Sequence, residues 1–190
     1  MPDGQPTALS VCVLGTWPYA LNVVDAVPGV QGDQSFYIWV WDTIARNILA
    51  GRWPFWTDRI FYPTGYNLLL STTIPIAALP SILFLNHLTL YVGMLSLLSI
   101  AGAVVTVALL VTTMRGSLAT GLLLGSIYAL GPVRDAVVRA HVGPAIAAML
   151  VPLLVVAAYR AAESPTWRRL VAAMLVLWLI VSTYIYYGIV

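Results

Sequence analysis

The sequence predicts an all-α protein, a polytopic bundle of transmembrane helices whose first external loop carries amphipathic interfacial helices. Hydrophobic residues make up 61% of the 190 residues, charged residues only 8%, and the mean hydropathy is +0.91. A soluble domain of this size has too little interior to bury so much apolar surface. The apolar runs do not alternate with a period of two, which favours helices over a barrel. We therefore treat residues 1–190 as a single transmembrane domain.

Five segments are candidates for membrane-spanning helices. Each is apolar along most of its length, and about 20 helical residues cross a bilayer. They cover residues 7–27, 90–114, 118–132, 143–161 and 170–190. The last segment runs to the final residue without a polar flank, so we expect the chain to be a fragment of a longer protein.

The orientation follows from the positive-inside rule. The loop from Arg160 to Arg169 carries three arginines against Glu163 alone, which predicts a cytoplasmic position. A short N-terminus on the cytoplasmic side then places the loop 28–89 outside. Only an odd number of crossings can join this loop to the next cytoplasmic turn. We therefore expect residues 73–88 to lie on the surface or to re-enter the membrane without spanning it.

The first external loop contains the pattern of an amphipathic helix over residues 34–50. Apolar residues recur there every four positions. They are Phe36, Val40, Ile44 and Ile48. On another face, Asp42 and Arg46 are spaced to pair at i and i+4. We expect this helix to lie at the membrane surface and to end at Gly51.

The remaining polar residues of interest fall in the two external loops. In the first loop, residues 53–56 (Trp-Pro-Phe-Trp) suit an interfacial anchor, and residues 63–65 (Pro-Thr-Gly) predict a turn. This loop also carries Asp33 and Asp58. The second external loop, at about 133–142, is short and carries Arg134, Asp135, Arg139 and His141.

Together these residues resemble the C-type (GT-C) integral-membrane glycosyltransferases, which use polyprenyl-phosphate sugar donors. The residues that carry the resemblance are Pro28-Gly29, Gly32-Asp33, the aromatic run Phe36–Trp41, Gly51 with Pro54-Phe55, Tyr62-Pro63, Gly65, Asn67-Leu68, Pro75, Pro80, His141 and Tyr159-Arg160. The resemblance covers nearly the whole chain and corresponds to the N-terminal part of such an enzyme. It implies a bacterial or archaeal plasma membrane with the first loop extracytoplasmic.

The resemblance also implies roles for the polar residues. Asp33 matches the acidic residue of the family's first external loop and is the candidate base for the acceptor hydroxyl. The candidates for binding the leaving phosphate are Arg134, Arg139 and His141. Asp58 is a further candidate for substrate binding, and Asp58 or Asp135 could support Mg²⁺ or Mn²⁺. The expected partners are a lipid-linked sugar donor and membrane lipids, with no nucleic acid.

Each assignment has a structural alternative. Asp33 could cap the helix that follows it, and Asp58 could form a surface ion pair with Arg59. Arg134, Asp135 and Arg139 are spaced to pair along one helical turn. The alternative function is a non-catalytic membrane subunit or a transporter fragment, in which the long loop anchors or docks the chain. The oligomeric state is left open.

Overall fold

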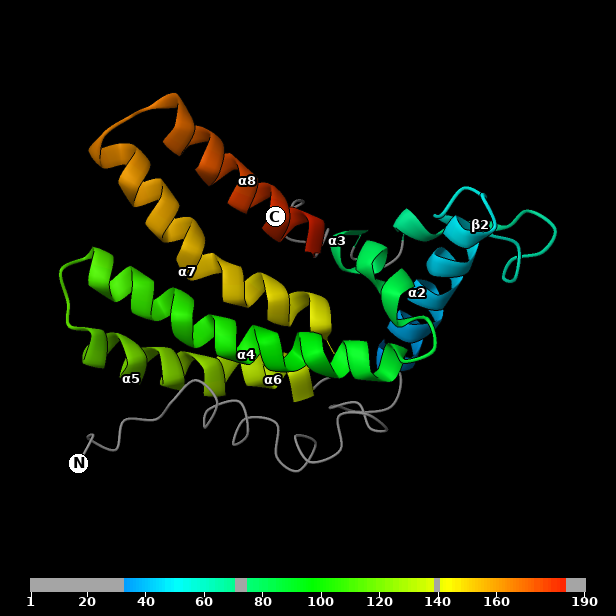
Figure 1. Cartoon of the computed structure of the whole chain (residues 1–190), viewed down its shortest axis with the longest axis horizontal. Helices are drawn as coiled ribbons and strands as arrows, with labels where there is room; N and C mark the ends of the chain where they lie inside the picture. The colour runs from blue at the N-terminus through cyan, green and yellow to red at the C-terminus, as the bar shows by residue number, and fades with distance from the viewer. Residues whose placement is uncertain (1–32, 71–74, 139–140, 184–190) are drawn as a thin grey trace.

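The computed structural model describes residues 33–70, 75–138 and 141–183, and these are mostly helical (Figure 1). The helices are α2 (Asp33–Leu49), α3 (Pro75–Ala78), α4 (Leu88–Thr113), α5 (Leu118–Tyr128), α6 (Arg134–Val138), α7 (Val142–Glu163) and α8 (Trp167–Thr183). Shorter turns of other helical types are η2 (Leu68–Leu70), η3 (Leu79–Phe84) and the π-helical η4 (Ala129–Val133). The strands are β1 (Trp56–Thr57) and β2 (Tyr66–Asn67).

Two helices, α4 and α7, are long and apolar enough to cross a membrane. They confirm the helices predicted at 90–114 and 143–161, and they support membrane association. Helix α5 has 11 residues, and the described part of α8 has 17. The segment predicted at 7–27 and the end of the segment at 170–190 lie outside the described residues.

Helix α4 is the centre of a bundle in which α5 and α7 pack on it and α8 packs on α7 (Figure 1). The contact between α4 and α5 is close because α5 presents glycine there. A Cβ on Gly125 would lie 2.6 Å from the carbonyl oxygen of Val104, and one on Gly121 would lie 2.8 Å from the Cα of Ala108. Small residues four apart let helix backbones approach in this way, as in membrane helix pairs.

The predicted loop after α5 is partly helical. The chain continues from α5 through the π-turn of η4, in which Gly131 has a non-helical backbone (φ −90°, ψ −106°), into α6. Pro132 lies inside this turn, where it cannot donate a backbone hydrogen bond, and this accounts for the break in the α-helical pattern. Arg134 and Asp135 therefore open a short helix, whereas the sequence predicted a loop for them.

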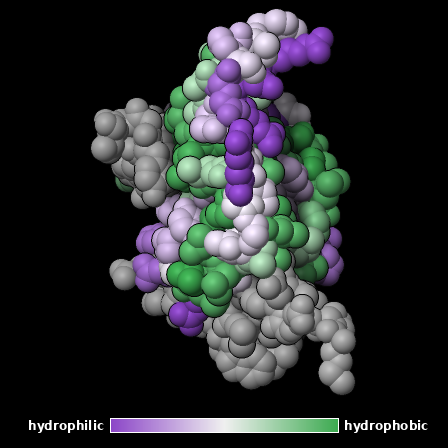
Figure 2. Space-filling model, turned by 90° about the vertical axis from the view of Figure 1, so that its left-hand side faces the viewer, coloured by the Kyte–Doolittle hydropathy of each residue, from purple (hydrophilic) through white to green (hydrophobic). Residues whose placement is uncertain are grey.

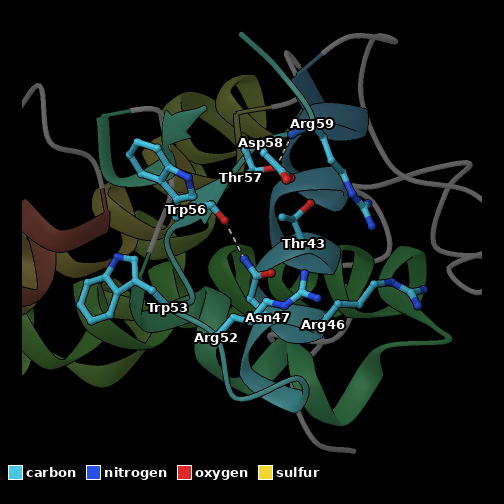
Figure 3. A pocket seen from close by; sticks show the side chains of 9 residues that line it. All are labelled: Thr43, Arg46, Asn47, Arg52, Trp53, Trp56, Thr57, Asp58 and Arg59. Carbon is cyan, nitrogen blue, oxygen red and sulfur yellow. Dashed lines mark hydrogen bonds between the residues drawn. The ribbon is translucent and has the colours of Figure 1, made fainter. Parts of the chain in front are cut away.

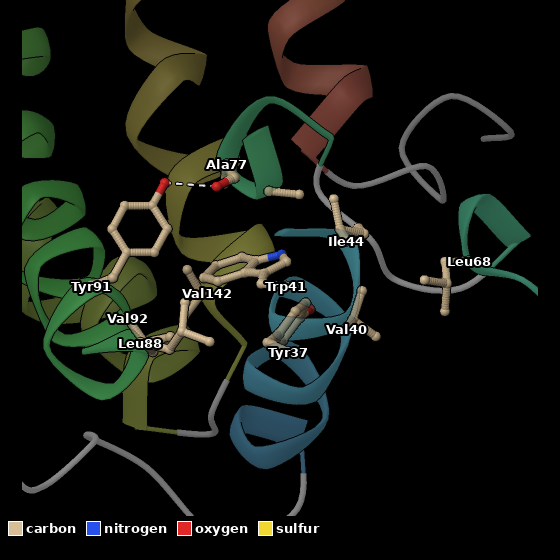
Figure 4. Packing of buried hydrophobic residues seen from close by; sticks show 11 residues of the cluster. Tyr37, Val40, Trp41, Ile44, Leu68, Ala77, Leu88, Tyr91, Val92 and Val142 are labelled. Carbon is tan, nitrogen blue, oxygen red and sulfur yellow. Dashed lines mark hydrogen bonds between the residues drawn. The ribbon is translucent and has the colours of Figure 1, made fainter. Parts of the chain in front are cut away.

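Helix α2 is present where the sequence predicts it, and the pair of Asp42 and Arg46 is present as well. Most of the predicted apolar side is buried, since Val40 and Ile44 are 0% exposed, but Phe36 is 37% exposed while Tyr37 and Trp41 are buried. This side packs on a core cluster shared with α3, the start of α4 and the start of α7 (Figure 4). The helix is therefore fixed to the bundle by its apolar side.

The segment between α2 and α4 has a mixed structure. Gly51 ends α2 with φ +64°, the left-handed conformation that glycine adopts most easily. The turn predicted at residues 63–65 is present over 62–64, and it joins β1 to β2 as an antiparallel ladder. This ladder departs from the all-α prediction. The segment 73–88, predicted to be a broken surface or re-entrant piece, contains the short helices α3 and η3.

Candidate functional site

A pocket of about 290 Å³ lies between the second half of α2 and the chain that folds back after Gly51 (Figure 3). Its walls combine cationic, aromatic and hydroxyl side chains. They are Thr43, Arg46, Asn47, Arg52, Trp53, Trp56, Thr57, Asp58 and Arg59. We call it the arginine pocket.

The backbone around the arginine pocket is held by the Asn47 side chain. Its Nδ2 donates to the carbonyl oxygen of Trp56 at 2.7 Å and to that of Pro54 at 3.3 Å. The backbone N–H of Arg52 donates to the carbonyl of Asn47 at 2.8 Å, so one residue of α2 anchors both ends of the returning chain. The backbone N–H of Arg59 donates to the Thr57 hydroxyl, 3.2 Å away.

The pocket has an excess of positive charge. The Arg46 Nε donates to both carboxylate oxygens of Asp42, at 2.8 and 2.9 Å, and this hydrogen bond raises the pKa of Arg46 further above its ordinary value. Among the described residues, no carboxylate forms an ion pair with Arg52 or Arg59. With Arg46 paired to Asp42, Arg52 and Arg59 face a single lining carboxylate, that of Asp58. Planar guanidinium groups bind phosphate and carboxylate groups through paired hydrogen bonds.

The aromatic side of the pocket suits a ligand that also has apolar faces. Trp53 and Trp56 lie to one side of Arg52, and Arg46 and Arg59 extend to the other (Figure 3). Both tryptophans are exposed, although large aromatic side chains are usually covered. A pocket with a few cationic groups and aromatic walls can orient an anionic ligand that presents a ring or another apolar face.

Of the described candidate residues that the sequence grouped together, the structure sets only Asp58 apart, because the backbone N–H of His141 donates to the carbonyl of Ala136, next to Asp135, at 2.8 Å. Asp58 lines the arginine pocket. Arg134 and Asp135 are exposed at the start of α6, and His141 directly precedes α7. Asp33 is the first residue of α2, and its side chain lies outside the described part, as does the whole of Arg139.

The turn of α2 that begins at Asp33 and the start of α7 belong to the same core cluster. Tyr37 lies one turn after Asp33, Val142 directly follows His141, and both are buried members of this cluster (Figure 4). Arg46 is about 20 Å farther along α2 than Asp33, because a helix rises about 1.5 Å per residue. The arginine pocket and the predicted base are therefore at different ends of α2.

Sequence reasoning did not find the arginine pocket. It noted that Arg46 could pair with Asp42, and it assigned residues 53–56 to a membrane anchor. The available signal was the local density of cations, because three of the nine arginines fall between residues 46 and 59 in a chain with few charges. Within the described ranges, no three side chains of His, Cys, Asp or Glu gather as a metal site would require.

Comparison with known proteins adds no family. No family model matches the sequence, no curated protein matches it, and no solved structure matches the fold. The resemblance to the C-type glycosyltransferases stays a prediction from the residues quoted above.

Proposed function

We propose that this chain acts in a membrane glycosyltransferase that moves a sugar from a lipid-phosphate donor to an acceptor hydroxyl. The observation that carries the proposal is the core cluster that joins the first turn of α2 to the first turn of α7. Asp33 opens the first of these helices and His141 precedes the second. Such a reaction needs a base for the acceptor hydroxyl and, close to it, a positively charged side chain for the leaving phosphate.

The cluster is packed well enough to hold these two helix ends in fixed positions. The rings of Tyr37 and Trp41 lie 5.8 Å apart, and the rings of Trp41 and Tyr91 lie 5.4 Å apart in an edge-on arrangement. Trp41 and Val142 are both 0% exposed. Groups mounted on packed helices are positioned more accurately than groups on free loops, and accurate positioning is a large part of catalysis.

The roles follow from the bonds that change. The acceptor oxygen forms a bond to the anomeric carbon, its proton passes to the Asp33 carboxylate, and the bond between that carbon and the phosphate oxygen breaks. The electron pair stays on the lipid phosphate, which Arg134, Arg139 and His141 stabilise. Mg²⁺ or Mn²⁺ at Asp135 would need further oxygen ligands. The described residues gather no such set, so no step of the proposal depends on a metal ion.

The arginine pocket has a separate role in this proposal. It lies about 20 Å along α2 from Asp33, so it cannot hold the phosphate that leaves from the reacting carbon. Its three arginines and two tryptophans suit an anionic part of a substrate that lies away from the reaction centre. Its volume of about 290 Å³ is sufficient for a single phosphate or sugar unit.

The test is sugar transfer by the complete protein in its membrane, with a panel of radiolabelled polyprenyl-phosphate sugars as donors. We expect Asp33→Asn to lower the transfer rate at least about 100-fold, the range of a lost general base. Glu163→Gln is the matched control, because it removes one carboxylate charge at the exposed end of α7, away from α2 and the arginine pocket, and should leave the chemical step in place. Equal transfer by the Asp33→Asn variant and the unaltered protein, at equal expression, would contradict the proposal.

A further inference from the structure

A second pocket, of about 520 Å³, lies between α4, α7 and α8, near the connection that joins α7 to α8. This connection is at the end of the bundle opposite α2 (Figure 1). The lining residues are Leu109, Leu153, Val156, Ala157, Arg160, Glu163, Arg168, Arg169, Ala172 and Val176. The pocket is therefore amphipathic, with an apolar wall of aliphatic side chains and a cluster of three arginines.

Two of the three arginines are held by hydrogen bonds to uncharged oxygens. Arg169 donates from Nη1 to the carbonyl oxygen of Arg160 at 2.8 Å and to the Ser164 hydroxyl. Arg160 donates to the Thr113 hydroxyl at 3.4 Å. Within the described part of the chain, neither of these arginines nor Arg168 forms an ion pair, although Glu163 also lines the pocket. The cluster thus has a net positive charge, and Arg160 and Arg169 are fixed within it by these bonds.

The surroundings of the cluster are those of a membrane boundary. Figure 2 views the molecule from this end and shows hydrophilic residues gathered in a band with hydrophobic residues on both sides. Trp167 is 70% exposed beside the pocket, and the Arg168 guanidinium lies 5.7 Å from its ring centre. Exposed tryptophan next to arginine is typical of the level at which lipid headgroups meet water.

We propose that this pocket binds an anionic phospholipid, with the headgroup phosphate on the arginine cluster and one acyl chain along the apolar wall. An arginine guanidinium can bind two phosphate oxygens through paired hydrogen bonds, and basic pockets between transmembrane helices bind anionic headgroups. The aliphatic wall of Leu109, Leu153 and Val156 continues from the arginines toward the membrane-spanning parts of α4 and α7. A free phosphate would leave this wall uncovered. The site is independent of the proposed transferase reaction.

The experiment is native mass spectrometry of the detergent-purified full chain, titrated with phosphatidylglycerol, phosphatidylcholine or inorganic phosphate. We expect phosphatidylglycerol to bind most tightly, and the double variant Arg160→Gln/Arg168→Gln to weaken it at least about tenfold, as the loss of two surface cations predicts. The double variant Arg52→Gln/Arg59→Gln removes the same charge from the arginine pocket and should change the affinity by less than about twofold. Thermal unfolding in detergent identifies any variant that fails to fold.

A further variant tests the apolar wall. Ala172 lines the pocket on the exposed side of α8, so Ala172→Trp should fill the path of the acyl chain without disturbing the core. We expect it to reduce phosphatidylglycerol binding and to leave binding of inorganic phosphate unchanged. Equal binding of phosphatidylcholine, or unchanged phosphatidylglycerol binding in both pocket variants, would overturn the proposal. In the Arg52→Gln/Arg59→Gln variant, whose arginine pocket is disabled, phosphate binding as tight as lipid binding would show an anion site only and would overturn it too.

Discussion

The hydroxyl of Tyr91 on α4 donates a hydrogen bond of 2.7 Å to the carbonyl oxygen of Ala77 in α3. Both residues are buried. This bond ties the proline-interrupted segment before α4 to the helix on which the bundle is built. The ring of Tyr91 also stacks on Phe84 at 4.9 Å and meets Trp41 edge-on, so one side chain connects α2, α3, η3 and α4.

Tyr91→Phe should therefore destabilise the protein although it keeps the ring. The substitution leaves the buried carbonyl of Ala77 without its partner, which costs about 1–3 kcal/mol of unfolding free energy. Tyr62→Phe is the matched control, because Tyr62 is 85% exposed and water can replace its hydroxyl contacts. Thermal unfolding in detergent measures both. A control variant as destabilised as Tyr91→Phe would show that the hydrogen bond to Ala77 is not the cause.

A second prediction concerns the contact between α4 and α5. Gly125→Ala should lower the unfolding free energy by about 1–3 kcal/mol, since the added methyl meets the backbone of Val104 and the two helices have to separate. Ala119→Val enlarges a side chain on the exposed side of the same helix, where it meets no neighbouring backbone. We expect little change from it. Unfolding midpoints in denaturant compare the two variants, and a smaller shift for Gly125→Ala than for Ala119→Val would argue against this packing.

A third prediction concerns the hydrogen bonds by which the Asn47 side chain fixes the chain around the arginine pocket. Asn47→Ala removes the two hydrogen bonds to the carbonyls of Pro54 and Trp56. Trypsin cleaves after arginine, and local opening of the chain controls such cleavage. We expect faster cleavage after Arg52 and Arg59 in this variant, while Asn86→Ala, an exposed amide outside the pocket, serves as the control. Unchanged cleavage rates would mean that other contacts hold the returning chain.

The sequence predicted those parts of the fold that depend on local pattern. Continuous apolar runs predicted α4 and α7, because a long stretch of aliphatic residues is sufficient to identify such helices. The four-residue spacing and the pair of Asp42 and Arg46 predicted α2. Its end at Gly51 was predicted because glycine readily adopts the left-handed backbone conformation that ends a helix. Each of these signals lies within a few residues of the structure that it determines.

What the sequence missed depends on contacts between distant segments. The spacing of four correctly selected Val40 and Ile44 for the buried side of α2. It missed Tyr37 and Trp41, which are buried by contacts with the start of α4 and of α7. The ladder of β1 and β2 has two residue pairs, which is too short for a visible alternation. The arginine pocket forms only when residues 52–59 fold back on α2, so nothing in the local pattern places Arg59 beside Arg46.

The proposed transferase site requires the start of α2 and the start of α7 to meet at Asp33 and His141, away from Asp58. The sequence contains a single cysteine, so the full chain with Cys12→Ser accepts spin labels at chosen pairs of introduced cysteines. We would measure electron spin distances for Asp33→Cys with His141→Cys, and for Asp33→Cys with Asp58→Cys. The proposal predicts that the first pair is clearly closer than the second, because Asp58 lines the pocket beside the second half of α2. A first pair that is as far apart as the second, or farther, would contradict the shared site and the transferase mechanism built on it.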